Sequence, residues 1–304
     1  MKLVFLGTPE FAVPSLGSVV EAGHEVAAVF TQPDRPKGRG RETAMPPVKQ
    51  SALKLGLTVF QPERVRRPEA VEQLRAMAPE AMVVVGYGQI IPQSILDIPP
   101  LGIINVHASL LPKYRGAAPV QWAIARGETQ TGVTTMRIDA GLDTGDMLLK
   151  WETRIGEEET AIELGERLAS AGAELLVRTL EELRTIRPEP QDGSQATLAP
   201  ILKKEDGHVD WARPAREILN RVRGFEPWPG CYGFLRGQRL HIRKAAHADV
   251  SLAAGRLRAS GKRLFAGSGD GSIELLEVQL EGKKRMLADA FLNGTTIEAG
   301  DVLR

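Results

Sequence analysis

The stretch Ile104-Asn105-Val106-His107-Ala108-Ser109-Leu110-Leu111-Pro112 places polar side chains at the end of an otherwise apolar run. The run at residues 102–106 predicts a buried strand. Asn105 and His107 are two residues apart, and side chains at that spacing point to the same face of a strand. We therefore expect an amide and an imidazole to lie side by side where this strand ends.

A second polar segment, Gly141-Leu142-Asp143-Thr144-Gly145-Asp146, follows the β-branched run Val133-Thr134-Thr135. The run predicts another strand, and the glycines near Asp143 let its carboxylate approach other groups closely. An amide, an imidazole and a carboxylate that converge at strand ends suit acyl transfer. Asn105, His107 and Asp143 are therefore the candidate catalytic residues.

Strands and helices alternate through the first half of the chain. Strands are predicted at residues 2–6, 26–30, 57–60 and 83–85, with helices at residues 10–21, 48–55 and 70–78. This alternation predicts an α/β fold with a doubly wound, mostly parallel sheet and helices on both faces. Such sheets bind ligands beyond the carboxyl ends of their strands. We expect the loops after residues 85, 107 and 138 to meet there.

Other chemistries lack a motif in this chain. No G-x-G-x-x-G follows the first strand and no G-x-x-x-x-G-K-[ST] occurs, which disfavours dinucleotide and ordinary P-loop sites. The single cysteine, Cys231, has no second thiol, and no two histidines have the i, i+4 spacing of zinc ligands on a helix. We expect no metal to be required at the active site.

The C-terminal third has a different pattern. A helical apolar face runs through residues 161–183, and a linker rich in Pro and Gly follows it. Short strands at residues 231–235, 239–243, 263–265 and 272–278, separated by turn glycines, predict a small OB-like β-barrel. The predicted domains are a catalytic domain at residues 1–189, a linker at 190–206 and an OB-like domain at 207–304.

The composition is that of a globular protein: 304 residues, 42% apolar and 25% charged. No apolar run approaches the roughly 18 residues that a membrane span needs. The lone cysteine fits a reducing compartment, and no exposed apolar heptad indicates self-association. We expect a cytoplasmic monomer that does not bind membranes.

Charge is distributed unevenly along the chain. Residues 200–304 carry 18 Lys+Arg and 13 Asp+Glu, a net charge of +5. The whole chain has 39 Lys+Arg and 38 Asp+Glu, so residues 1–199 carry 21 and 25, a net charge of −4. A basic C-terminal third can attract an acidic partner such as nucleic acid. An ordinary solvated surface is the alternative explanation of so small an excess.

Motifs along nearly the whole chain resemble those of the methionyl-tRNA formyltransferase family. They are Thr31-Gln32-Pro33-Asp34-Arg35-Pro36, Asn105-Val106-His107 with Ser109-Leu110-Leu111-Pro112, Tyr114-Arg115-Gly116-Ala117-Ala118-Pro119, Gly141-Leu142-Asp143-Thr144-Gly145-Asp146-Met147, Glu281-Gly282-Lys283-Lys284-Arg285-Met286 and Phe291-Leu292-Asn293-Gly294. All enzymes that use 10-formyltetrahydrofolate share the motifs of the first domain. The basic loop at residues 31–47 and the C-terminal segments narrow the resemblance to the tRNA enzymes. The family commonly has Gly at the position of Ala108, a difference of one methyl group.

The resemblance implies formyl transfer from 10-formyltetrahydrofolate to the α-amino group of methionine on initiator methionyl-tRNA. Asn105 would donate a hydrogen bond to the oxyanion of the tetrahedral intermediate, and losing such a donor costs ~10²–10³ in rate. His107 would donate to the same oxygen when protonated, or relay a proton when neutral, an effect of ~10²–10⁴. Asp143 would orient and charge His107 or, through water, accept the proton of the amine.

The resemblance also implies that the loops at residues 85–91 and 139–143 form part of a pterin pocket, with much of the recognition by backbone groups. The residues assigned to the folate are Gly88, Ile90, Ser109, Leu110, Leu111, Pro112 and Asp139. Alternatively, the turn that contains Ser109 only holds the strand end in place, and Asp139 is only a turn residue.

The loop Lys37-Gly38-Arg39-Gly40-Arg41 has the composition of an anion-binding segment, although a charged surface loop is the plain alternative. The resemblance makes Arg39 the residue expected to enter the acceptor end of the tRNA, with Arg35, Lys37 and Arg41 on phosphates. The cations that would extend this track are Lys203, Lys204, Arg236, Arg239, Arg243, Lys283 and Lys284. Such contacts weaken as salt rises.

Three other functions remain open on the sequence alone. A sugar-nucleotide formyltransferase shares the folate core but does not need the basic loop at residues 31–47. A hydrolase would release formate without an amine acceptor. A non-catalytic folate- or tRNA-binding module has no need of Asn105, His107 and Asp143 together.

Overall fold

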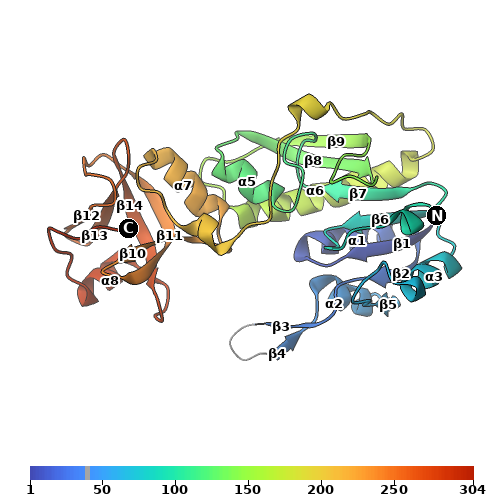
Figure 1. The fold of residues 1–304 in the computed structure, drawn as a ribbon, viewed down its shortest axis with the longest axis horizontal. Helices are drawn as coiled ribbons and strands as arrows, with labels where there is room; N and C mark the ends of the chain where they lie inside the picture. The colour runs from blue at the N-terminus through green and yellow to red at the C-terminus, as the bar shows by residue number, and fades with distance from the viewer. Residues whose placement is uncertain (38–41) are drawn as a thin grey trace. The chain divides into compact units, whose positions relative to one another are not determined.

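The computed structural model of the protein describes residues 1–37 and 42–304 (Figure 1). The chain forms two compact units whose segments alternate along the sequence. The first unit comprises Met1–Gly116, Thr131–Thr153 and Gly165–Leu198, and the second comprises Ala117–Gln130, Arg154–Leu164 and Ala199–Arg304. No helix within the described ranges has the length and apolarity to cross a lipid bilayer.

A seven-stranded sheet of order β5-β2-β1-β6-β7-β8-β9 forms the centre of the first unit (Figure 1). Its strands are β1 (Lys2–Gly7), β2 (Glu25–Phe30), β5 (Val59–Phe60), β6 (Ala81–Val85), β7 (Ile103–His107), β8 (Gln130–Arg137) and β9 (Met147–Arg154). The strands from β5 to β7 run parallel, which confirms the predicted doubly wound, mostly parallel sheet. Because β1 lies between β2 and β6, the sheet order reverses there, and such a point is where open α/β sheets bind ligands.

Helices cover both faces of this sheet. They are η1 (Glu10–Ala12), α1 (Val13–Glu21), α2 (Pro47–Lys54), α3 (Pro68–Ala76), α4 (Gln93–Leu96) and α6 (Ala161–Glu182). On one face, Leu74 of α3 and Ile95 of α4 pack against alternate strand residues that include Ile103 of β7. This face is called the α3/α4 face below.

Helix α6 covers the opposite face at β7. A Cβ atom added at Gly172 would lie 2.9 Å from the Val106 Cγ1 atom, so the helix and the strand are in close contact there. Since side chains alternate along a strand, Asn105 and His107 point away from α6. They therefore lie together on the α3/α4 face, and the prediction from their two-residue spacing that they share a face is confirmed.

One strand departs from the parallel pattern, although the loop that follows it still reaches His107, since Asp143 lies 3.8 Å from that residue. Strand β8 runs antiparallel to β7, with His107 opposite Thr134 and Ile104 opposite Arg137. The loop after residue 138 therefore begins at the amino end of β7 and not at its carboxyl end. A parallel arrangement needs a crossover on the sheet, but α5 (Pro119–Ala125), the helix between the two strands, belongs to the second unit.

A short hairpin follows β2. Strands β3 (Arg35–Lys37) and β4 (Glu42–Ala44) pair antiparallel, with Arg35 opposite Ala44. The sequence predicted only a loop at residues 31–47, because strands of three residues carry too little pattern to detect.

The second unit contains an antiparallel sheet of order β10-β11-β14-β13-β12, with β15 beside β14. Its elements are η3 (Lys204–Gly207), α7 (Ala215–Gly224), β10 (Cys231–Leu235), β11 (Gln238–Ala248), β12 (Leu257–Ser260), β13 (Arg263–Gly267), β14 (Ser272–Leu280), β15 (Met286–Leu287) and α8 (Ala288–Gly294). The C-terminal residues bridge both sheet edges, because Leu303 pairs with Leu235 and Val302 pairs with Arg256. These bridges close the sheet, and the predicted small β-barrel is confirmed.

The core of the second unit includes α5, which the sequence pattern did not predict. Trp122 of α5 packs edge-on against Phe225, with ring centroids 5.3 Å apart. Ile218 and Val222 of α7 join the same apolar cluster as the barrel residue Leu240. An aromatic pair of this geometry contributes ~0.5–1.5 kcal/mol beyond its buried area.

Candidate active site at the end of β7

Asn105 is buried, and its side chain has no hydrogen-bond partner among the described residues. The residue is 8% exposed, and its side-chain amide makes no hydrogen bond to residues 1–37 or 42–304. A buried asparagine that serves the fold is expected to bond to backbone or water. The two N–H groups of Asn105 are therefore available to a bound molecule.

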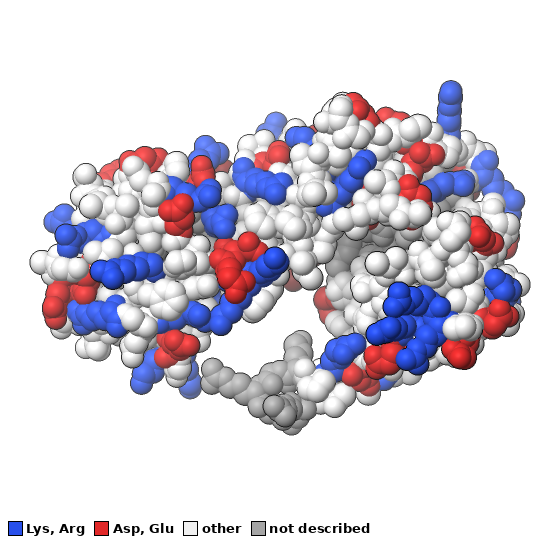
Figure 2. Space-filling view, viewed as in Figure 1, with Lys and Arg blue, Asp and Glu red and all other residues white. Residues whose placement is uncertain are grey.

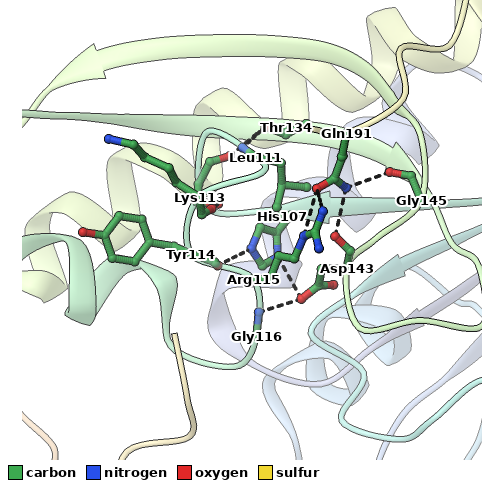
Figure 3. Close-up of polar contacts among 11 residues, drawn as sticks. His107, Leu111, Lys113, Tyr114, Arg115, Gly116, Thr134, Asp143, Gly145 and Gln191 are labelled. Atoms are coloured by element: carbon green, nitrogen blue, oxygen red, sulfur yellow. Dashed lines mark hydrogen bonds and ion pairs between the residues drawn. The ribbon is translucent and has the colours of Figure 1, made fainter. Parts of the chain in front are cut away.

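His107 has a different partner at each ring nitrogen (Figure 3). Nε2 lies 2.8 Å from the carbonyl oxygen of Tyr114, and Nδ1 lies 3.8 Å from Oδ2 of Asp143. A carbonyl oxygen can only accept, so Nε2 carries a proton and donates it. The remaining nitrogen, Nδ1, is the one that can gain or release a proton beside the carboxylate.

The Asp143 carboxylate is held by the backbone of the segment that follows β7. Oδ2 accepts a hydrogen bond of 2.8 Å from the backbone N–H of Gly116. The separation of 3.8 Å from His107 is an ion-pair distance and too long for a direct hydrogen bond. Asp143 has φ +51°, in the left-handed region that Asp tolerates better than most residues.

Three residues outside the sequence-based assignment hold these groups in place. Arg115 donates through Nε and Nη2 to Oε1 of Gln191, at 3.0 and 2.8 Å. Nε2 of Gln191 donates to the carbonyl oxygen of Asp143 at 2.9 Å. Thr197 accepts from the N–H of Tyr114 through Oγ1. Arg115 lies in the Tyr114-Arg115-Gly116 motif, which the sequence analysis singled out. Gln191 and Thr197 lie in the predicted linker, where no motif indicated a role at the site.

The turn after β7 is fixed by its own hydrogen bonds. Ser109 is fully buried and its hydroxyl donates to the carbonyl oxygen of Lys113 at 2.6 Å. Thr134 of β8 donates to the carbonyl of Ser109 at 2.7 Å and accepts from the N–H of Leu111 at 3.1 Å. Leu111, 2% exposed, packs against Met136. These contacts fit the structural alternative for Ser109 and Leu111, and a folate role for either residue stays a prediction.

The other residues assigned to the folate lie on three loops. Leu110 and Pro112 are partly exposed in the turn after β7, and Gly88 is exposed with φ +82°. Asp139 is exposed, and its carboxylate accepts from the N–H of Gly141 at 3.0 Å and from Oγ1 of Thr144 at 2.7 Å. Asp139 therefore caps its own loop, and its contact with folate remains a prediction.

Large apolar side chains are exposed on both loops of the predicted pterin pocket. Ile90 is 90% exposed and Leu142 is 63% exposed. Apolar side chains of this size that remain uncovered beside polar groups are suited to contact a ring system. The fit to a pterin is therefore reasonable on these two loops.

Tyr87 contributes its backbone and not its phenol to this region. Its side chain is 1% exposed within the core of the α3/α4 face, and burial raises the pKa of the phenol. Its carbonyl oxygen accepts from Oγ1 of Thr8 at 3.0 Å and from Nε2 of Gln32 at 3.1 Å. These bonds tie together the loops that follow β1, β2 and β6.

The basic loop assigned to tRNA is described only in part. Arg39 and Arg41 lie outside the described residues, and only the backbone of Lys37 is described, in β3. Arg35 is exposed, with Nη2 3.7 Å from Oε2 of Glu63. A pair this exposed contributes little, so the guanidinium of Arg35 remains accessible to phosphate.

The cations assigned to tRNA in the second unit fall into two groups. Lys203, Lys204, Lys283 and Lys284 are exposed, and the structure of residues 42–304 gives them no ion pair. By contrast, Arg236 donates to both carboxylate oxygens of Asp301, and Arg243 donates to Glu226 and Gln279.

Arg239 stacks with its Cζ atom 4.5 Å from the centroid of the Tyr232 ring. On the face in view, Figure 2 shows Lys and Arg interspersed with Asp and Glu over the barrel rather than one continuous basic surface. Within the described part of the chain, no three His, Cys, Asp or Glu side chains could together hold a metal ion.

Comparisons with known proteins agree over the whole chain. Residues 1–180 match the family described as formyl transferase, and residues 201–296 match its C-terminal domain. A methionyl-tRNA formyltransferase of Solibacter usitatus is 64% identical over 100% of this chain and 98% of its own length. One of Koribacter versatilis is 58% identical over the same shares, 100% and 98%.

A solved structure also resembles this chain. It is an N-formyltransferase from Helicobacter canadensis, in complex with folinic acid and dTDP-3-aminofucose. The TM-score is 0.67 and the identity 17%, over 94% of this chain and 100% of that one. At this identity, the likeness shows the fold alone.

Proposed function

The chain belongs to the formyl transferase family, and from that premise we propose that it formylates the α-amino group of methionine on initiator methionyl-tRNA, with 10-formyltetrahydrofolate as donor. The full-length identity to methionyl-tRNA formyltransferases supports the choice of acceptor. The observation that carries the chemistry is the amide of Asn105, which has no partner in the described part of the chain and lies on the same strand face as His107.

In this reaction the amine nitrogen attacks the formyl carbon, and the carbonyl oxygen gains negative charge. The N–H groups of Asn105 donate to this oxygen without giving up a hydrogen bond to residues 1–37 or 42–304. A donor that is already in place stabilises the intermediate more than water would, because nothing has to reorganise.

The collapse of the intermediate requires a proton to move. A new C–N bond forms, the bond between the formyl carbon and N10 of the folate breaks, the amine loses a proton and N10 gains one. His107 can hold this proton at Nδ1, since Nε2 stays bonded to the carbonyl of Tyr114. The Asp143 carboxylate at 3.8 Å stabilises the charged ring.

The substrates are assigned to separate groups of residues. The folate lies against the loops at residues 85–91 and 139–143, with Ile90 and Gly88 among its contacts. The tRNA contacts the basic loop with Arg39 and the exposed lysines, of which Lys283 and Lys284 are examples. We further propose that catalysis belongs to residues 1–189 and tRNA binding to residues 207–304, and that the protein acts as a cytoplasmic monomer with no metal at the active site.

The acceptor is tested by offering the purified protein 10-formyltetrahydrofolate with each of three acceptors. These are initiator methionyl-tRNA, a dTDP-linked amino sugar, and water alone. Formylation of methionyl-tRNA with no formate released in its absence supports the proposal. Transfer to the amino sugar alone would retain the folate chemistry and refute the acceptor, and formate release without acceptor would indicate a hydrolase.

A further inference from the structure

The segment at residues 189–198, called the site strap below, crosses the active-site loops instead of linking domains freely. At one end, Glu189 and Met147 exchange two backbone hydrogen bonds of 2.9 Å. At the other end, the carbonyl of Thr197 accepts from the N–H of Arg115 at 2.8 Å. The site strap is thus bonded both to the loop that carries Asp143 and to the turn that carries Tyr114 and Gly116.

Gln191 occupies the middle of the site strap with every polar atom of its amide used (Figure 3). Oε1 accepts two bonds from Arg115, and Nε2 donates to the carbonyl oxygens of Asp143 and Gly145, at 2.9 and 2.7 Å. The amide cannot be flipped, because flipping would place oxygen against two carbonyls and NH₂ against the guanidinium. Arg115 therefore fixes the direction in which Gln191 donates.

Within the loop at residues 139–146, the bonds from Gln191 hold the residues that the loop's internal hydrogen bonds do not. The carboxylate of Asp139 holds Gly141 and Thr144, and the carbonyl of Asp146 accepts from the N–H of Arg137. Among the described residues, Asp143 accepts hydrogen bonds only from Gly116, at its carboxylate, and from Gln191, at its backbone carbonyl. The left-handed backbone of Asp143 needs such support, since few residues adopt that conformation unaided.

We propose that Gln191, oriented by Arg115, is a positioning residue that holds Asp143 in its left-handed conformation and so directs the carboxylate toward His107. This inference rests on the proposed function, because it assigns Asp143 a part in formyl transfer. A shift of Asp143 by ~1 Å, with the ring of His107 left in place, is enough to slow a step that depends on their separation.

The test compares Gln191→Glu with a matched control, Gln195→Glu, on the same segment. Glutamate keeps the length of Gln191 and its contact with Arg115, but it presents an acceptor oxygen to two carbonyl oxygens, so both bonds to the loop are lost. Gln195 is exposed and, among the described residues, its side chain bonds only to Asp192, so its substitution breaks no bond to residues 139–147. Formyl transfer to methionyl-tRNA gives kcat and KM, and hydrogen–deuterium exchange reports on residues 139–147.

Gln191→Glu is expected to lower kcat ~10-fold or more, with both KM values within ~2-fold of wild type. Deuterium uptake at residues 139–147 is expected to rise in this variant and not in Gln195→Glu. In an Asp143→Ala background, Gln191→Glu should lower kcat no further, since a residue that acts only through Asp143 has nothing left to position.

The outcomes separate this inference from the proposed function. If wild type formylates methionyl-tRNA while Gln191→Glu keeps its kcat, or if the two substitutions lower kcat additively, the positioning role is refuted. If wild type does not formylate methionyl-tRNA, the proposed function fails. Deuterium uptake then tests the inference by itself. If uptake at residues 139–147 is unchanged in Gln191→Glu, the claim that Gln191 holds the loop of Asp143 is refuted.

Discussion

Asn105 in the first unit and Asn220 in the second are each 8% exposed, yet they are used differently. Oδ1 of Asn220 accepts from Nε and Nη2 of Arg223, at 3.1 and 2.9 Å, and Arg223 in turn donates to two backbone carbonyls. Asn105 makes no such bond within the described chain. Equal burial therefore does not indicate equal purpose, because the hydrogen-bond partners decide between a structural and a functional role.

The histidines repeat this contrast. His107 has a partner on each side of its ring, at Tyr114 and Asp143. His241 in the barrel is partly buried, and burial, followed by the charges of Arg243 and Arg239, lowers the pKa of its imidazole. The ring of His241 packs against the ring of Tyr232, whereas Nδ1 of His107 lies 3.8 Å from a carboxylate oxygen of Asp143.

The largest expected effect is that of His107→Ala. We expect kcat for formyl transfer to fall ~10²–10⁴-fold, because the proton-holding group beside the intermediate is lost. His241→Ala is the matched control, and its kcat should stay within ~3-fold of wild type. Steady-state kinetics give kcat for both variants. Similar losses of kcat in the two variants would contradict the distinction between the two histidines.

Asn105→Ala and Asn220→Ala test the opening comparison directly. We expect Asn105→Ala to lower kcat ~10²–10³-fold. It should change the free energy of unfolding by less than ~1 kcal/mol, since no hydrogen bond of its side chain to the described residues is broken. Asn220→Ala should keep its kcat and lower the free energy of unfolding by ~1–3 kcal/mol, because Nε and Nη2 of Arg223 lose their acceptor. Kinetics and urea unfolding measure both quantities. A large stability loss in Asn105→Ala would mean that its amide has a structural partner.

In the second unit, cations without an ion pair in the described structure, such as Lys283 and Lys284, should contribute to tRNA binding, whereas the paired Arg243 should contribute to stability. The double variant Lys283→Ala, Lys284→Ala is expected to raise KM for methionyl-tRNA a few-fold. The slope of log(kcat/KM) against log[salt] should become shallower by ~1–2, because two phosphate contacts are lost. Arg243→Ala should leave that slope unchanged and lower thermal stability, because it separates from Glu226 and Gln279. Assays from low to moderate salt distinguish the two, and an equal slope change in both would contradict the distinction.

The smallest effect concerns acid stability. Hydrogen bonds from Arg236 hold the pKa of the Asp301 carboxyl below its usual range. A lowered pKa stabilises the fold above the unfolded value of about 4, and this stabilisation is lost as pH falls through the lower folded value. Asp301→Asn should therefore lower Tm by roughly 2–5 °C at pH 7 and by less at pH 3.

Thermal unfolding between pH 7 and pH 3 measures this difference. Asp249→Asn is the control, since the Asp249 side chain is 99% exposed and its substitution should leave the Tm profile unchanged. If the loss of Tm in Asp301→Asn were the same at every pH, ionisation of Asp301 would play no part.

Local pattern was sufficient for the elements that build the site. The apolar run before His107 predicted β7, and two-residue alternation was enough to place Asn105 and His107 on one face. Alternating strands and helices likewise predicted the doubly wound sheet, and the evenly spaced turn glycines predicted the barrel. These features depend on residues close together in the sequence.

Features that depend on distant residues were not predictable. Strand β8 runs antiparallel to β7 and α5 belongs to the second unit, and no local pattern records either feature. The pairing of Arg236 with Asp301 joins residues 65 apart in sequence, so a count of charges could not show that this cation is already neutralised. Gln191 was assigned to a linker because proline and glycine surround it, although its amide bonds to the loop of Asp143.

The central claim is that formyl transfer to methionyl-tRNA takes place where β7 ends, with Asp143 acting on His107. Asp143→Asn tests it most directly, because the variant keeps the shape of the side chain and an acceptor for Gly116 while it removes the charge. In single-turnover transfer from 10-formyltetrahydrofolate with both substrates saturating, we expect the rate to fall ~10²-fold or more, with tRNA binding unchanged. A variant that transferred formyl at the wild-type rate would place the chemistry elsewhere in the molecule.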